Sequence, residues 1–309
     1  MIHAVALAAL VAALHVPAGY HASVYATGLE HPTALAFGPD GRLYVSEDVG
    51  KVVSVGRGTT RPRVFRRNLR VPLGLLWRGR TLYVSETGRV EAFRRGGGRR
   101  VVLASLPNGR HQQDAIVAGP DGRLYLGSGS TCDACKERDA RSAAILSFRP
   151  DGSDLRVVAR GLRNPYGLTF VGRALYATVN ARDDLGGGEP AESVVRVRAG
   201  ADYGWPWCWP SFATHMLVGS CGGVARPVAF LEPHSSADGI VSWRGDLFVA
   251  EWGEYLSHRH GRVVVRIRRG RVLPFASGFD HPLALAVDPA GDLLVADWGR
   301  GAIYAIAKS

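Results

Sequence analysis

The chain has 309 residues, of which 46% are hydrophobic and 21% are charged. This composition excludes an intrinsically disordered chain and favours a globular fold with a substantial core. The formal net charge is +11, but only three of the 38 basic residues are lysines, and the arginines are scattered through turn-like segments without interleaved aromatic residues. This distribution favours solvated loops over a nucleic-acid-binding groove, so we expect no nucleic-acid partner.

The N-terminal segment contains one apolar run, Ala4–Val16. It is shorter than the ~20 residues that a membrane-spanning helix needs, so we expect no stable membrane insertion. Val16 and Ala18 stand at the −3 and −1 positions of a possible cleavage site before Gly19, although Met1–His3 carries no Lys or Arg. The segment is typical of a secretory signal peptide. We therefore expect residues 1–18 to be a signal peptide and the protein to be secreted or extracytoplasmic.

One sequence pattern recurs six times after this segment. Each copy has a short apolar run, a turn that usually contains glycine, such as Pro39-Asp40-Gly41, and a second run such as Leu43-Tyr44-Val45. A third run often follows, as in Lys51–Val55 and Arg89–Phe93. The copies are His31–Glu47, Val71–Glu86, His111–Ser128, Asn164–Val179, His234–Glu251 and His281–Asp297. Repeated strand–turn–strand units at this period predict an all-β, six-bladed β-propeller that forms a single domain over residues 19–309. We expect His21–Thr27 to complete the sheet of the last blade, because this closure protects its edge.

The spacing between copies predicts two inserted loops. The longest intervals between second runs follow Leu124 and Leu175, which places insertions at Thr131–Ser142 and at roughly Arg182–Pro227. Loops added to a rigid repeat scaffold are common places for functional sites. We expect the Trp205–Trp209 cluster in the second insertion to pack beneath that long loop.

The four cysteines lie in these two insertions. Cys132 and Cys135 form a CxxC pair, whereas Cys208 and Cys221 are too far apart in sequence to be a second close pair of the kind a structural zinc site uses. An even count in an exported chain favours two local disulfides, Cys132–Cys135 and Cys208–Cys221. The second would close a loop worth about 3 kcal/mol in chain entropy. A redox-active CxxC is the alternative, but no thioredoxin-like βαβ pattern surrounds it.

Residues that lead into the innermost strand of each blade gather at one mouth of a propeller's channel. The repeat places these residues there: Val71-Pro72, Arg110-His111, Arg163-Asn164, His234 and His281-Pro282. A histidine and an arginine from different blades could act there as a general base and as a clamp for developing negative charge. The alternative is that these residues only begin strands, because His-Pro occurs twice in the repeat.

Four ordered motifs carry a resemblance to a known family. They are His111–Cys135 with its isolated histidine and CxxC, "GLRNPYGL" (Gly161–Leu168), "ATVNARDD" (Ala177–Asp184) and "YGWPWC" (Tyr203–Cys208). Together they resemble the glucose/sorbosone dehydrogenase family, especially its sorbosone-type branch, and the similarity runs from about Gly28 to Ile306. The resemblance implies a quinoprotein that uses pyrroloquinoline quinone (PQQ) and calcium. It also implies an oxidoreductase that oxidises a sugar, aldose or aldehyde and passes the electrons to an external acceptor.

The resemblance also implies roles for individual residues. His111 stands in the place of the general base that takes the sugar hydroxyl proton, and Arg163 in the place of the residue that holds the quinone oxygen. The cofactor-binding residues that it suggests are Arg163, Asn164, Gln112, Arg141, His234 and His281. The calcium ligands that it suggests are Asn180, Ala181, Asp183 and Asp184.

Three positions depart from the family pattern. His281 stands where the family usually has arginine, Asp114 stands where sorbosone-type members often have a basic residue, and Gly253–Arg259 differs from the usual "GSWNR". Two positive charges are thereby lost, and a non-catalytic propeller that binds a ligand or partner is the alternative. A lactonase-like metal hydrolase ranks third. It would need convergent carboxylates, and the recurring acids Glu47, Glu86, Glu251 and Asp297 are instead expected to end strands or to pair with arginines.

Overall fold

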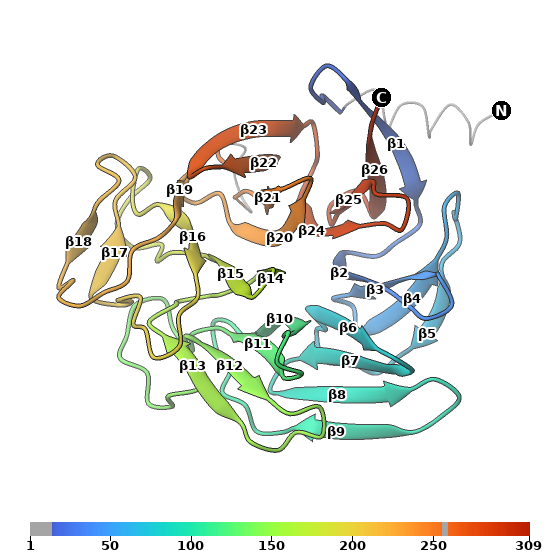
Figure 1. The fold of residues 1–309 in the computed structure, drawn as a ribbon, viewed down its shortest axis with the longest axis horizontal. Coiled ribbons are helices and arrows are strands. Elements are labelled where there is room, and N and C mark those ends of the chain that lie inside the picture. The colour runs from blue at the N-terminus through green and yellow to red at the C-terminus, as the bar shows by residue number, and fades with distance from the viewer. Residues whose placement is uncertain (1–13, 255–258) are drawn as a thin grey trace.

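Six four-stranded antiparallel sheets surround a central channel in a computed structural model that describes residues 14–254 and 259–309 (Figure 1). The predicted all-β, six-bladed β-propeller is confirmed. Within the described residues there is no helix, and hence none that is long and apolar enough to cross a membrane.

The strands follow one another from the channel outwards in each blade. Blade 1 comprises β2 (Pro32–Phe37), β3 (Leu43–Glu47), β4 (Lys51–Val55) and β5 (Arg63–Arg66). Blade 2 comprises β6 (Gly74–Arg78), β7 (Thr81–Glu86), β8 (Arg89–Arg94) and β9 (Arg99–Leu103). Blade 3 comprises β10 (Gln113–Ala118), β11 (Leu124–Ser128), β12 (Ala144–Phe148) and β13 (Arg156–Arg160).

The other three blades carry the insertion and the chain closure. Blade 4 comprises β14 (Leu168–Val171), β15 (Ala174–Val179), β16 (Glu192–Arg196) and β19 (Ala229–Leu231), with a separate hairpin of β17 (Cys208–Pro210) and β18 (Leu217–Gly219). Blade 5 comprises β20 (Ala237–Trp243), β21 (Asp246–Glu251), β22 (Val263–Arg268) and β23 (Arg271–Ser277). Blade 6 comprises β24 (Pro282–Val287), β25 (Leu293–Asp297), β26 (Ala302–Lys308) and, at its edge, β1 (Tyr20–Ala26).

The N-terminal strand closes the ring as predicted. Strand β1 pairs antiparallel with β26, with Tyr20 opposite Lys308 and Val24 opposite Tyr304. The closing strand therefore supplies backbone partners to what would otherwise be the exposed edge of the last blade. Just before β1, His15 exchanges backbone hydrogen bonds with Ser277 of β23. Residues 1–13 of the predicted signal peptide lie outside the described residues, so its cleavage stays a prediction.

The second predicted insertion is shorter than expected. The loop predicted over Arg182–Pro227 contains strand β16, whose Ser193, Val194 and Val195 are buried between β15 and β19. The prediction of one continuous loop was therefore wrong. The insertion is in fact two segments, and the second one carries the β17–β18 hairpin at the outer edge of the molecule (Figure 1). Both predicted disulfides are present, and Cys208–Cys221 joins this hairpin to the segment that follows it.

The innermost strands pack backbone against backbone. Near the start of each innermost strand, the residue at the equivalent position is small in every blade: Ala34, Gly74, Ala115, Gly167, Gly239 and Ala284. A Cβ atom added at Gly74 would overlap the Asp114 carbonyl oxygen of the neighbouring inner strand, and one added at Gly167 would overlap the Asp238 carbonyl oxygen. The close approach of neighbouring inner strands therefore requires the absence of a side chain at these glycines. It sets the diameter of the channel and the positions of the loops at its mouth.

We expect Gly74→Ala to lower the free energy of unfolding by about 1–3 kcal/mol, because the new methyl group must displace packed backbone of β10. Gly56→Ala is the matched control, since nothing lies within 4 Å of the Cβ atom it would add. Urea unfolding of both variants and the wild type measures the difference. Equal stability of the two variants would contradict the close-packing argument.

Candidate active site

A cavity of about 510 Å³ opens at one mouth of the channel, and all six blades contribute residues to its lining. Seven of the residues predicted from sequence line it: His111, Arg163, Asn164, Asn180, Ala181, Asp183 and His234. The structure thus brings together residues from blades 3, 4 and 5 that are far apart in the chain.

The other four predicted residues lie outside this lining. Arg141 forms an ion pair with Asp139 at 2.7 Å, and the Asp184 carboxylate pairs with Arg182 at 2.5 Å. Gln112 donates a hydrogen bond to the Val71 carbonyl oxygen at 3.1 Å. His281 packs against Trp252, with ring centroids 4.1 Å apart. Local partners therefore account for Arg141 and Asp184 without a role in binding.

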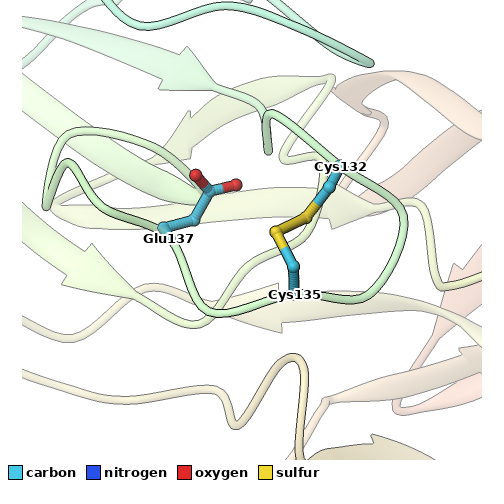
Figure 2. Close-up of side chains that lie close together, drawn as sticks. All are labelled: Cys132, Cys135 and Glu137. Carbon is cyan, nitrogen blue, oxygen red and sulfur yellow. A yellow bond between two sulfur atoms is a disulfide. The ribbon is translucent and has the colours of Figure 1, made fainter.

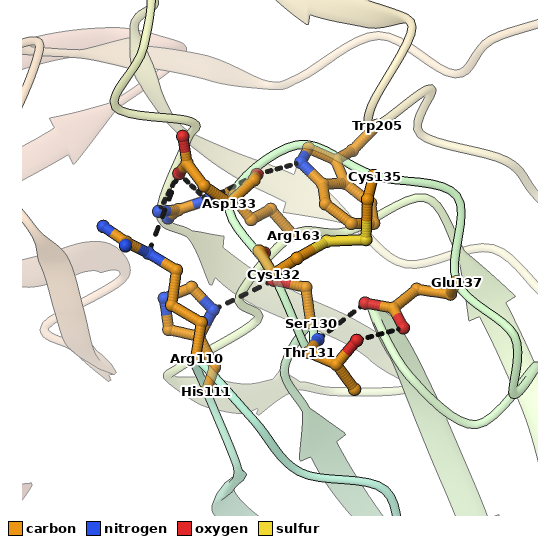
Figure 3. Close-up of a disulfide and its surroundings, with 10 residues drawn as sticks. All are labelled: Arg110, His111, Ser130, Thr131, Cys132, Asp133, Cys135, Glu137, Arg163 and Trp205. Carbon is orange, nitrogen blue, oxygen red and sulfur yellow. Dashed lines mark hydrogen bonds and ion pairs between the residues drawn. A yellow bond between two sulfur atoms is a disulfide. The ribbon is translucent and has the colours of Figure 1, made fainter.

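The orientation and tautomer of His111 are set by Ser130. His111 Nδ1 lies 3.0 Å from Ser130 Oγ, and Ser130 Oγ donates its hydrogen bond to the Cys132 carbonyl oxygen at 2.6 Å (Figure 3). A serine hydroxyl has one proton, so Ser130 Oγ must accept the hydrogen bond from His111. The proton of the neutral imidazole therefore resides on Nδ1, and Nε2 carries the free lone pair. Nε2 is the nitrogen that can accept a proton from a substrate.

The imidazole of His111 is held in its neutral form. Burial, together with the positive charges of Arg163 and Arg110, lowers the pKa of His111 to about 3. The ring is consequently unprotonated at neutral pH, as a general base must be before it acts.

Arg163 belongs to a cluster of four charged side chains. Its side chain is only 3% exposed, and its Nη2 lies 2.6 Å from Asp133 Oδ1 and 2.7 Å from Asp183 Oδ2. Arg110 Nη2 also lies 2.6 Å from Asp183 Oδ2. The formal charges of two guanidinium groups and two carboxylates therefore sum to zero. A buried arginine requires such charge compensation. Asp133 was not identified from the sequence, because its role depends on the fold of the CxxC loop.

Asn164 and Asn180 line the cavity at the start of blade 4, and hydrogen bonds fix both side chains. Asn164 Nδ2 donates to Asn180 Oδ1 at 2.8 Å, and Asn180 Nδ2 donates to the Ala237 carbonyl oxygen at 2.9 Å. These bonds fix both amide groups and leave the buried Asn164 Oδ1 without a partner. A buried oxygen without a protein partner is uncommon, and this one leaves an acceptor available beside the cavity.

The loop predicted to bind calcium borders the same cavity. The Ala181 backbone N–H donates to Glu192 Oε2 at 2.7 Å, and His234 Nε2 lies 2.8 Å from the Gly186 carbonyl oxygen. These contacts hold the loop at both ends, with the Asp183 carboxylate in the lining between them. Asp183 is nearly half exposed, and the two arginines contact its Oδ2, which leaves Oδ1 as the oxygen available to a cation.

Two buried aspartates lie at the level where the innermost strands begin. Burial raises the pKa of Asp238 and of Asp114 well above the usual range of a carboxyl group, and for Asp114 the nearby Asp238 adds to the effect. Both carboxyl groups therefore favour the neutral form. Burial thus makes Asp114 ionise less readily than an exposed aspartate would.

Two tryptophans that sequence reasoning missed form a wall of the cavity. Trp252 and Trp298 line it, with ring centroids 5.6 Å apart, and Trp298 stacks on His31 at 3.9 Å. His281 packs against them, with its ring 4.1 Å from Trp252. A signal was present in the sequence, since each tryptophan directly follows the acid that ends the second strand of its blade, Glu251 or Asp297.

The Trp205–Trp209 cluster lies outside the cavity. Trp205 Nε1 donates to the Asp133 carbonyl oxygen at 2.9 Å, which supports the CxxC loop as a packing role implies. Trp207 does not fit that expectation, because it is 62% exposed. Its position on the outer hairpin places it in solvent.

The recurring acids hold loops in place. Glu47 Oε1 accepts the Glu30 backbone N–H at 2.7 Å, and the Asp297 carboxylate accepts the backbone N–H groups of Asp280 at 2.8 Å and His281 at 2.9 Å. Glu86 pairs with Arg89 at 2.5 Å, in line with the predicted arginine pairing. None of the four recurring acids lines the cavity. The arrangement therefore gives no support to a lactonase-like metal site built from them.

One group of three metal-binding residue types clusters closely within the part of the chain that the structure describes. It is Cys132, Cys135 and Glu137 (Figure 2). The two cysteines are joined in a disulfide, and Glu137 accepts hydrogen bonds from the Thr131 backbone N–H at 2.6 Å and from its Oγ1 at 2.8 Å. In this oxidised form the sulfur atoms are not thiolate ligands. The group therefore stabilises the conformation of the loop.

Comparison with known proteins shows the fold. No family model and no curated protein matches the chain. Among solved structures, the calcium structure of Trichoderma reesei Carbohydrate-Active Enzymes family AA12 is 17% identical, with a TM-score of 0.82 over 96% of this chain and 97% of that chain. The holo form of the pyranose dehydrogenase PQQ domain from Coprinopsis cinerea is 18% identical, with a TM-score of 0.82 over 95% of this chain and 96% of that chain. The PQQ-bound aldose sugar dehydrogenase from Streptomyces coelicolor is 22% identical, with a TM-score of 0.74 over 95% of this chain and 100% of that chain.

We expect the ring resonances of His111 to keep their neutral-form positions as the pH falls from 8 to about 5, because its pKa is lowered to about 3. In the unfolded chain the same ring binds a proton near pH 6.5. The unfolded state thus binds more protons between these two values, so His111 makes the free energy of unfolding fall as the pH falls through this window.

Urea unfolding of the wild type and His111→Gln at pH 7.5 and pH 4.5, together with an NMR titration, measures both effects. We expect His111→Gln to lose part of the pH dependence. A titration midpoint near 6.5 for His111 in the folded protein would contradict the structure.

Proposed function

We propose that this chain is a PQQ-dependent oxidoreductase that oxidises a sugar or aldose by removing hydride from a carbon that bears a hydroxyl group. The observation that carries the proposal is the free Nε2 of His111 in a cavity whose lining also includes Arg163 and Asn164. The PQQ-bound sugar dehydrogenases of the same fold support it.

The residues of the cavity fit PQQ. Its volume of about 510 Å³ lies in the usual range for pockets that bind small organic ligands. Trp252 and Trp298 offer an apolar surface for a planar ring, and Arg163 offers the planar guanidinium that suits carboxylates and quinone oxygens. Arg163, Asn164 and the two tryptophans would hold the cofactor. When bound, the quinone supplies a two-electron acceptor for hydride.

Calcium fits the adjoining loop. Calcium prefers carboxylate and backbone carbonyl oxygens, and Asn180, Ala181 and Asp183 of this loop offer both types beside Asn164. A calcium ion at Asp183 would also change the charge balance of the cluster that contains Arg110, Arg163 and Asp133. The cluster is formally neutral without the ion and would carry excess positive charge with it. This excess positive charge favours a cofactor with several carboxylates. It also compensates for having a histidine rather than an arginine at position 281.

The protein residues perform the proton transfer. As hydride leaves the substrate carbon, the hydroxyl group on that carbon loses its proton to His111 Nε2, and the carbon–oxygen single bond becomes a carbonyl. The hydrogen bond from Nδ1 to Ser130 keeps the ring in position during this step. With the quinone bound, Arg163 would supply positive charge to stabilise the negative charge that develops on the acceptor.

We further propose an extracytoplasmic location, an external electron acceptor and a sugar or aldehyde substrate. The two disulfides favour an oxidising compartment. A propeller that binds a ligand without oxidising it is the alternative that activity measurements distinguish.

We expect purified protein supplied with PQQ and calcium to reduce an electron-accepting dye when an aldose is added. His111→Ala should lower kcat by about 10²–10⁴-fold, the usual contribution of a positioned base, while PQQ affinity is kept. Arg163→Ala should weaken both, because the guanidinium contacts the cofactor before and after reduction. His21→Ala, on the exposed edge strand β1, is the control and should match the wild type.

Full dye reduction by His111→Ala would show that another group is the base. If the wild type reduces no dye with any aldose, alcohol or aldehyde, the redox proposal is wrong and the binding alternative replaces it.

A further inference from the structure

The loop closed by the Cys132–Cys135 disulfide contacts both residues of the proposed catalytic pair (Figure 3). On one side, Asp133 Oδ1 lies 2.6 Å from Arg163 Nη2 and 3.1 Å from its Nε. On the other side, the Cys132 carbonyl oxygen accepts the proton of Ser130 Oγ. Two adjacent residues of one cross-linked turn thus contact the site: Asp133 binds Arg163 directly, and Cys132 acts on His111 through Ser130.

The contact with Arg163 determines which way its guanidinium faces. Nε and Nη2 are occupied by Asp133, whose backbone carbonyl also accepts from Nε at 3.2 Å. The remaining nitrogen, Nη1, lies 3.5 Å from the Asn180 carbonyl oxygen, beside the predicted calcium-binding loop. Nη2 also contacts Asp183 Oδ2 at 2.7 Å, so among the described residues Asp133 is the sole partner of Nε but shares Nη2 with Asp183. Displacement of Asp133 would therefore leave Nε without its partners and Nη2 with Asp183 alone, so the guanidinium would be held less firmly.

The contact with Ser130 determines the tautomer of His111. Ser130 accepts from Nδ1–H only while its own proton is directed to the Cys132 carbonyl oxygen. If that carbonyl moves away, the hydroxyl is free to donate to Nδ1 instead, and the imidazole proton then shifts to Nε2. In that tautomer the nitrogen that faces the cavity has no lone pair for a substrate proton.

The disulfide is what keeps these two groups in place within so short a turn. Its ends are three residues apart, and the turn has no regular secondary structure of its own. Glu137 anchors Thr131, just before the turn, and Trp205 holds the Asp133 carbonyl oxygen from outside. These bonds hold the flanks, whereas the cross-link constrains Cys132 and Asp133 themselves.

We infer that the Cys132–Cys135 disulfide is a positioning element of the active site, which holds Asp133 against Arg163 and the Cys132 carbonyl against Ser130, and so fixes the Nδ1–H tautomer of His111. Asp133 and Ser130 are then positioning residues. The relevance to catalysis rests on the proposed function, but the link from the disulfide to the two side chains does not.

The test is an NMR measurement on cofactor-free protein labelled with ¹⁵N in histidine and arginine. In the wild type we expect the Nδ1–H pattern for His111 and a slowly exchanging Nε–H for Arg163. In Cys132→Ser/Cys135→Ser we expect part of the His111 signal to move to the Nε2–H pattern and Arg163 Nε–H exchange to accelerate by about 10-fold or more. Cys208→Ser/Cys221→Ser is the matched control, because it removes the other disulfide, and it should leave both signals unchanged.

Two further variants keep the disulfide intact and separate its two effects. Asp133→Asn should accelerate exchange at Arg163 while His111 keeps its tautomer, and Ser130→Ala should shift the His111 tautomer while Arg163 stays protected. Wild-type signals for His111 and Arg163 in a folded Cys132→Ser/Cys135→Ser protein would overturn the inference. If that variant does not fold, unchanged signals in Asp133→Asn and Ser130→Ala would overturn it.

Activity with PQQ and calcium adds a separate measurement. Loss of an outer partner of a functional residue typically costs 10–100-fold, so we expect such a fall in kcat for both single variants. If the wild type has no activity but the NMR signals move as described, the proposed function fails and the positioning role of the disulfide stands.

Discussion

Backbone contact between neighbouring innermost strands is the constraint on which the site depends. Gly74 and Gly167 abut the carbonyl oxygens of Asp114 and Asp238 in the next blade, with no room for a side chain between them. Six strands packed this closely leave a narrow channel, so the loops that enter them must converge at its mouth. His111 and Arg163 come together for this reason, although they belong to different blades.

The fold could be predicted because its information is local and repeated. Each copy of the repeat carries its own strands and turn, and six copies with a closing N-terminal strand define the propeller. Strand β16 was missed because the inserted segments of blade 4 lengthen the repeat there. Its Val194 and Val195 are nevertheless apolar and buried, as in the other blades. The site was predictable only in part. Residues at repeat positions, such as His111 and Asn164, could be found, whereas Asp133 acts through a contact between segments distant in sequence.

The electrostatics of the site favour an anionic ligand that arrives with a cation. Arg110 and Arg163 are matched by Asp133 and Asp183, and position 281 carries a histidine that packs against Trp252. The cavity therefore lacks excess positive charge by itself. A divalent ion on the Asp183 side would supply it. Burial keeps His111 neutral, and the nearby guanidinium groups of the same cluster add to this effect. One set of charges thus serves both cofactor binding and the state of the base.

Calcium-dependent binding of PQQ is the most direct test of this account. Equilibrium titration of the purified wild-type protein with PQQ, once with excess calcium and once with a calcium chelator, measures it without reference to any substrate. The account predicts a single saturable site for each chain with calcium, and affinity weakened by at least 10-fold without it. Absence of binding in calcium, or equal binding with the chelator, would contradict the central claim that this cavity is a calcium-assisted quinone site.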